Sequence, residues 1–118
     1  MLSSLLGFFT STPPEVNMSV KELVETAINE NKIIIFSKST CPYCRRAKAL
    51  FATEYPDETA VVVELNQRED GYDIQNYLAI KTGQGTVPHI FINKQHIGGN
   101  DDAQAAFKRG DLTRLVKA

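Results

Sequence analysis

The sequence contains little cysteine, no tryptophan and no long hydrophobic run. Only two of its 118 residues are cysteine, too few for the disulfide framework of a small secreted domain. No stretch approaches the roughly 18 consecutive apolar residues of a membrane-spanning helix. The formal net charge of −1 gives no electrostatic reason to expect binding to nucleic acid or an anionic membrane. We therefore expect a soluble enzyme or binding module.

The first seventeen residues differ from the rest of the chain. Residues 1–10 are rich in Leu and Phe but carry no Lys or Arg, so they match neither a secretory signal nor a mitochondrial presequence. Residues 11–14 read as a linker, because consecutive prolines disfavour helix and sheet. We predict a flexible tail over residues 1–17, with a targeting segment as the alternative, and one compact domain over residues 18–118.

Apolar periodicity from residue 19 onward predicts alternating helices and strands. Helices are expected at 19–30 (opened by a Ser19–Glu22 capping box), from Pro42 to near Pro56, around 74–83, around 103–107, and for a short stretch that Asp111 caps after Gly110. Strands are expected at 32–37, 61–65, 89–92 and around 96–97, the first two as central strands. A helical crossover makes the first two strands parallel, and a tight turn makes the last two antiparallel. The expected fold class is α/β, a four-stranded mixed sheet flanked by helices.

The two cysteines are the strongest chemical feature of the chain. Cys41 follows a predicted strand and directly precedes Pro42 at a helix start, where free N–H groups and the helix dipole stabilise a thiolate. Lys38 and Arg45 add positive potential. Cys44 lies one helical turn further on and is expected to be more shielded. We predict that Cys41 is the nucleophile and Cys44 the resolving thiol.

Two other interpretations of the cysteine pair are open at this point. A zinc site would need two further ligands, and only His89 and His96 are present. Their spacing does not match a zinc finger, and they are expected to be surface or groove residues of a hairpin. The thiols can also be inert buried side chains.

Four short motifs occur in order along the chain: Lys38–Cys44 (KSTCPYC), Thr82–Gln84 (TGQ), Thr86–Pro88 (TVP) and Gly98–Asp102 (GGNDD). With them the sequence resembles the dithiol glutaredoxin family from about Ser19 to Val116. The resemblance implies a thioredoxin-like fold and glutathione-dependent reduction of protein disulfides and glutathione mixed disulfides. Thioredoxins carry a tryptophan beside the motif, which this chain lacks. Gly85 and His89 stand where many glutaredoxins carry Arg and Asn.

The resemblance also implies a glutathione site. Lys38 and Gln75 would bind the glycine carboxylate, and Asp102 would hold the γ-glutamyl ammonium. The γ-glutamyl carboxylate would lie at the helix start that follows Gly98-Gly99. The other residues implied in this site are Tyr43 as a wall, Thr86, Val87 and cis-Pro88 as an edge for the cysteine part, and Gly99, Asn100 and Asp101 around the γ-glutamyl carboxylate.

Glutathione and disulfide-bonded or glutathionylated proteins are the partners that the resemblance implies, with glutathione reductase acting indirectly on oxidised glutathione. We expect a monomer in the cytoplasm, with mitochondrial and secretory locations open. An iron–sulfur carrier, in which Cys41 ligates a [2Fe–2S] cluster shared by two copies, is an alternative that Pro42 disfavours. A thioredoxin-like reductase recycled by a flavoenzyme is a third interpretation.

Overall fold

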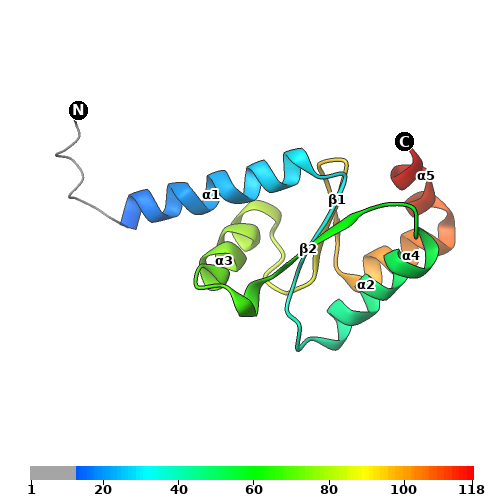
Figure 1. Ribbon diagram of the computed structural model, residues 1–118, viewed down its shortest axis with the longest axis horizontal. Coiled ribbons are helices and arrows are strands. Elements are labelled where there is room, and N and C mark those ends of the chain that lie inside the picture. The colour runs from blue at the N-terminus through cyan, green and yellow to red at the C-terminus, as the bar shows by residue number, and fades with distance from the viewer. Residues whose placement is uncertain (1–12) are drawn as a thin grey trace.

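Four strands form a mixed sheet with helices on both faces, as the computed structural model in Figure 1 shows. The structure describes residues 13–118, with side chains from residue 19 onward. The predictions made for residues 1–12, including the apolar segment and its targeting alternative, lie outside the described residues.

The strands are β1 (Ile33–Ser37), β2 (Ala60–Glu64), β3 (His89–Ile92) and β4 (Gln95–Gly98), in the order β2-β1-β3-β4. β1 is parallel to β2 and antiparallel to β3, which is antiparallel to β4. The predicted sheet is therefore confirmed. The prediction of a central position is wrong for β2, which lies at the sheet edge with Val62 38% exposed. An apolar run favours a buried strand, but it does not show whether both edges of that strand are paired.

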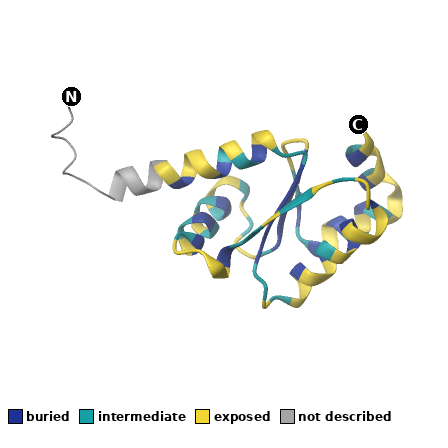
Figure 2. Ribbon diagram, viewed as in Figure 1, coloured by how far each residue is buried: buried dark blue, intermediate teal, exposed yellow. Residues whose placement is uncertain are grey.

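The helices are α1 (Pro13–Glu30), α2 (Pro42–Glu54), α3 (Gly71–Thr82), α4 (Asn100–Arg109) and α5 (Asp111–Lys117), with a 3-10 turn η2 (Leu65–Gln67). They cover the two faces of β1, whose side chains are all buried. Ile33 and Ile35 pack with α2, α4 and α5, whereas Ile34 and Phe36 pack with α1, η2 and α3. This alternation with period two explains the uninterrupted apolar run. In Figure 2 β1 is dark blue, and the helices show yellow on their outer faces.

α1 begins earlier than the sequence indicated. It starts at Pro13 instead of residue 19, so the linker prediction is wrong for Pro13 and Pro14, and Ser19 lies inside the helix. Two prolines can open a helix because the N–H groups of its first turn have no intrahelical partner in any case. The predicted domain boundary at residue 18 consequently falls within α1.

Candidate active site

Cys41 lies between the end of β1 and the first turn of α2. Its backbone is extended (φ −96°, ψ 120°) and its N–H donates to the Lys38 carbonyl at 3.0 Å, while Pro42 occupies the first helical position. The missing N–H of proline costs nothing there. The helix therefore begins where the Cys-Pro pair predicts, with Cys41 as its N-cap.

The two thiols differ in exposure. Both are free, and Cys41 is half-buried whereas Cys44 is fully buried. The Lys38 N–H donates to Cys44 Sγ at 3.4 Å, so the turn that carries Cys41 also holds the second sulfur. Ser39 fixes this turn to η2, because its N–H donates to Asn66 Oδ1 at 3.0 Å. Only Cys41 is accessible to a disulfide in solution.

Electrostatics separate the thiols further. Burial raises the pKa of Cys41, but the N–H groups of Cys44 and Tyr43, the Cys44 thiol and the charge of Arg45 outweigh it and hold that pKa below its ordinary value. Burial is also the largest influence on Cys44, whose pKa is raised even though the Lys38 N–H opposes this. Because the thiolate is the attacking form, the site favours Cys41 as its reactive sulfur.

The loop that leads into β3 faces Cys41. The Val87–Pro88 peptide bond is cis, and the Val87 carbonyl oxygen lies 4.0 Å from Cys41 Sγ. Within residues 13–118 the Val87 N–H makes no hydrogen bond. An extended ligand can therefore pair with Val87 as a short added strand, directly beside the thiol.

The start of α4 forms the other wall. The Gly99 N–H donates to Asp102 Oδ2 at 3.0 Å, so this carboxylate caps the helix. The N–H groups of Asn100 and Asp101 have no acceptor in the described part of the chain. Free N–H groups at a helix start bind anions such as carboxylates. This end of α4 can therefore accept a carboxylate while Asp102 supplies negative charge next to it.

A groove of about 380 Å³ runs between the loop and α4. It is lined by Tyr43, Gln84, Thr86, Val87, Pro88, Gly99, Asn100, Asp101 and Asp102. All of these except Gln84 are residues that the resemblance places at the glutathione site. Lys38 and Gln75 are not among the lining residues. The Gln75 amide instead donates to the Gly85 carbonyl at 2.9 Å.

The chain and its fold are similar to known proteins. Residues 33–97 match the family model described as Glutaredoxin. The chain belongs to the glutaredoxin family. It is 40% identical over 116 residues to Glutaredoxin-C4 of Arabidopsis thaliana, covering 98% of this chain and 84% of that protein. It is 46% identical over 99 residues to Glutaredoxin-1 of Rhizophagus irregularis, covering 84% and 96%. The crystal structure of a buckwheat glutaredoxin–glutathione complex is similar with a TM-score of 0.80 and 34% identity, covering 91% and 94%.

Family membership confirms the predicted fold and activity. The neighbouring solved structures are glutaredoxins with a thioredoxin-like fold. The protein is accordingly a glutathione-dependent thiol–disulfide oxidoreductase, with glutathione as its co-substrate. The Cys41–Cys44 pair fits the dithiol class of glutaredoxins.

The two histidines lie across the β3–β4 hairpin as predicted, but the surface or groove placement is wrong for His89. His89 is fully buried, and its Nδ1 lies 3.2 Å from Nε2 of the half-buried His96. His89 lies on the same face of β3 as Phe91, which packs on the α1–α3 side. It is buried because β3 is a central strand between β1 and β4, and His96 meets it from β4. The zinc alternative needed these imidazoles to join the cysteines. No group of three or more His, Cys, Asp or Glu side chains within residues 13–118 is placed to hold a metal ion.

Sequence reasoning missed two residues that shape the site. Gln84 lies within a recognised motif but was given no role, although it lines the groove. Asn66 follows β2 and fastens the Cys41 turn through Ser39, to whose Oγ its own amide donates at 2.8 Å. An Asn next to a turn is a weak signal, because its partners become visible only when distant segments meet.

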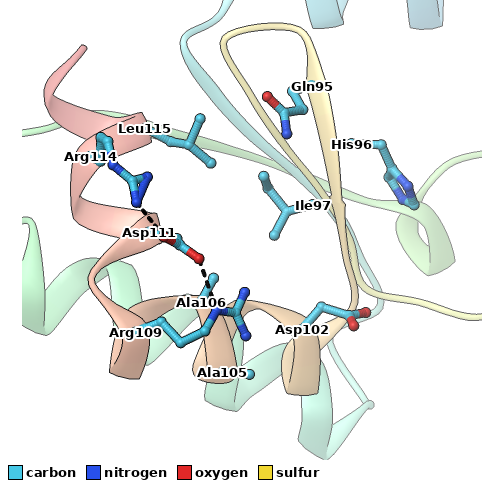
Figure 3. Close-up of a pocket in the computed structure, with 10 residues that line it drawn as sticks. All are labelled: Gln95, His96, Ile97, Asp102, Ala105, Ala106, Arg109, Asp111, Arg114 and Leu115. Carbon is cyan, nitrogen blue, oxygen red and sulfur yellow. Dashed lines mark hydrogen bonds and ion pairs between the residues drawn. The ribbon is translucent and has the colours of Figure 1, made fainter.

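A second cavity of about 450 Å³ opens between β4, α4 and α5 (Figure 3). Asp111 is predicted to cap the last helix, but it is the first residue of α5 and follows Gly110. Its carboxylate forms ion pairs with Arg109, at 2.8 Å, and with Arg114. No cysteine lines this cavity. The glutaredoxin chemistry therefore belongs to the groove beside Cys41.

Among the described residues, no helix is long and apolar enough to cross a membrane.

Proposed function

We propose that Cys41 is the nucleophile and Cys44 the resolving thiol of this glutaredoxin. The observation that carries the proposal is the contrast between the sulfurs. Cys41 stands half-exposed beside the Val87 carbonyl with a lowered pKa, while Cys44 is buried with a raised pKa. Of the two thiols, Cys41 is therefore the one that ionises first and can attack as a thiolate, while Cys44 stays protonated to higher pH.

In the route that uses Cys41 alone, its thiolate attacks the glutathionyl sulfur of a mixed disulfide. A Cys41–glutathione disulfide forms, the substrate disulfide bond breaks, and the substrate leaves as a thiolate that takes a proton from water. A second glutathione thiolate then attacks the glutathionyl sulfur on Cys41. Oxidised glutathione leaves and the Cys41 thiolate is regenerated, so the mixed disulfide and one glutathione thiol become the substrate thiol and oxidised glutathione.

In the route that uses both cysteines, Cys41 attacks a protein disulfide and forms a mixed disulfide with the substrate. Cys44 loses its proton and attacks Cys41 Sγ, which releases the reduced substrate and forms the Cys41–Cys44 disulfide. The spacing suits this step because residues three apart lie on the same side of a helix. Glutathione then reduces the intramolecular disulfide.

We place glutathione along the groove with its cysteine part paired to Val87. The γ-glutamyl carboxylate takes the free N–H groups of Asn100 and Asp101. Asp102 binds the ammonium through Oδ1, because Oδ2 already accepts from Gly99. Lys38 and the second N–H of Gln75 would bind the glycine carboxylate. Tyr43, Thr86, Pro88 and Gly99 supply the walls.

Glutathione-coupled reduction of a small mixed disulfide tests these roles. Wild type and Cys44→Ser should both be active, whereas Cys41→Ser should be inactive. With a protein disulfide as substrate, both Cys41→Ser and Cys44→Ser should be inactive. Residual turnover by Cys41→Ser, or loss of the mixed-disulfide activity in Cys44→Ser, would contradict the assignment.

The iron–sulfur alternative predicts a different assembly. The chain has two thiols and one of them is buried, so a cluster would need Cys41 from two copies. Our proposal is instead a glutaredoxin domain over residues 18–118 that acts as a cytoplasmic monomer, with glutathione reductase recycling its oxidised glutathione. A colourless protein that elutes as a monomer is expected, and a brown dimer absorbing visible light would contradict this.

A further inference from the structure

We propose that Gln84 is a positioning residue for glutathione. Its carboxamide holds the two backbone carbonyls that flank Val87 and thereby fixes the edge against which glutathione lies. The proposal rests on the function proposed above and concerns how the groove recognises the glutathionyl group.

The contacts of the Gln84 side chain are specific. Its Nε2 donates to the Thr86 carbonyl at 2.8 Å and to the Pro88 carbonyl at 2.9 Å. A primary amide has two N–H donors, and both are used here. Because both partners are acceptors, the nitrogen and not the oxygen of the amide must face the loop. The orientation of the carboxamide is therefore determined by the loop.

The loop has few other hydrogen bonds that could hold these carbonyls. Within residues 13–118, no further hydrogen bond uses the carbonyl of Thr86 or Pro88. Pro88 has no N–H, and Thr86 is exposed. Gln84 therefore holds the carbonyls of the Thr86–Val87 and Pro88–His89 peptide groups, one on each side of Val87 along the chain. A ligand that pairs with Val87 meets an edge that Gln84 has already ordered.

Gln84 is itself anchored to the end of α3 and lies close to the start of α4. Its backbone N–H donates to Thr82 Oγ1 at 3.0 Å, and that hydroxyl donates to the carbonyl of the buried Leu78 in α3 at 2.7 Å. A Cβ added to Gly99 would lie 3.8 Å from Gln84 Nε2 and 3.7 Å from the Pro88 oxygen. The carboxamide therefore lies where the loop, the end of α3 and the start of α4 meet.

None of these contacts reaches the sulfur of Cys41. The groups that lower the pKa of Cys41 are Cys44, Tyr43 and Arg45, all on α2. Removing the Gln84 donors should therefore weaken recognition of the glutathionyl group while the thiolate keeps its reactivity. A residue that merely supported the fold would change both properties together.

Two variants test the proposal. Gln84→Met keeps the length of the side chain without its donors, and Gln84→Glu keeps its shape with acceptors only. For each, kcat/KM for the mixed disulfide of glutathione and 2-mercaptoethanol should fall about tenfold, the effect of losing hydrogen bonds worth roughly 1–1.5 kcal/mol. The rate of Cys41 alkylation by iodoacetamide should stay within about twofold of wild type. Gln95→Met is the matched control, since Gln95 is exposed on β4 and does not line the groove.

The outcomes separate the possible errors. Unchanged kcat/KM in both folded Gln84 variants would overturn the positioning role and leave the proposed function intact. An equal loss in kcat/KM and in alkylation rate would also overturn it, because the residue would then be supporting the whole site. If wild type itself fails to reduce the mixed disulfide, the proposed function is wrong and the role of Gln84 falls with it.

Discussion

Replacing Gly98 with alanine tests how the start of α4 is built. Gly98 ends β4 with φ of +123°, and an added Cβ would lie 2.2 Å from Asp102 Oδ2. L side chains rarely adopt such a backbone conformation. The carboxylate would also have to move, and it could no longer accept the hydrogen bond from the Gly99 N–H. Gly98→Ala therefore combines backbone strain with loss of a helix cap.

The size of the effect follows from these two costs. A strained backbone conformation costs about 1–2 kcal/mol. Loss of a charged helix cap costs about 1–2 kcal/mol more. We expect Gly98→Ala to lower the free energy of unfolding by about 3 kcal/mol, which corresponds to a fall of roughly 10 °C in melting temperature for a domain of this size.

Urea denaturation with two comparison variants measures the cost of the backbone strain and the cost of the lost helix cap separately. Gly83 ends α3 with φ of +83°, but no atom would lie within 4 Å of an added Cβ. Gly83→Ala therefore reports strain alone and should cost about 1 kcal/mol. In an Asp102→Ala background, the cost of Gly98→Ala should fall by at least about 1 kcal/mol, because the displaced cap is already absent. Equal costs for Gly98→Ala and Gly83→Ala, or no coupling to Asp102, would refute the reasoning.

Acid stability, thiol labelling and one interhelical hydrogen bond provide further checks. Burial and the neighbouring His96 lower the pKa of His89 to about 4, below the value of about 6.5 in an unfolded chain. The resulting stability is present above about pH 6.5 and is lost as the pH falls towards 4. Urea titrations should therefore give a free energy of unfolding about 1–2 kcal/mol lower at pH 5 than at pH 7.5. The His89→Asn variant should show little of this change. Iodoacetamide should label Cys41 with a midpoint below that of an ordinary cysteine thiol and should leave Cys44 unlabelled in the folded protein. Mass spectrometry showing Cys44 labelled first would contradict this order of the two pKa values. Tyr77→Phe removes the hydrogen bond from the Tyr77 hydroxyl to Glu25 Oε2 at 2.5 Å and should lower the free energy of unfolding by about 1 kcal/mol, whereas an unchanged urea midpoint would show that this bond adds nothing.

Features that depend on local chemistry were determined by the sequence alone. Cys41 before Pro42 indicates a thiol at a helix start, because proline suits only the first turn of a helix. The apolar run of β1 indicates a strand covered on both faces, and the turn after Ile92 indicates the final hairpin. The order of these elements, with one helical crossover and one tight turn, was enough to predict the mixed sheet.

Other features were decided by the tertiary structure. β2 carries the same kind of apolar run as β1 but lies at the edge, because strand order depends on which strand β3 joins. α1 extends back to Pro13, so two prolines that resemble a linker in the sequence open a helix. His89 is buried because β3 is central and His96 meets its Nδ1 from β4.

The candidate site shows the same division between features set by local sequence and features set by the tertiary structure. The sequence indicated the two thiols from their types and spacing, since a Cys-Pro pair at a helix start is a local signal, and the resemblance to glutaredoxins supplied the residues around the groove. It could not identify the role of Gln84, whose partners are the backbone carbonyls of Thr86 and Pro88. Every residue has a backbone carbonyl, so sequence carries no mark of which carbonyls a side chain will reach. Only the folded loop, packed against the start of α4, brings donor and acceptors together.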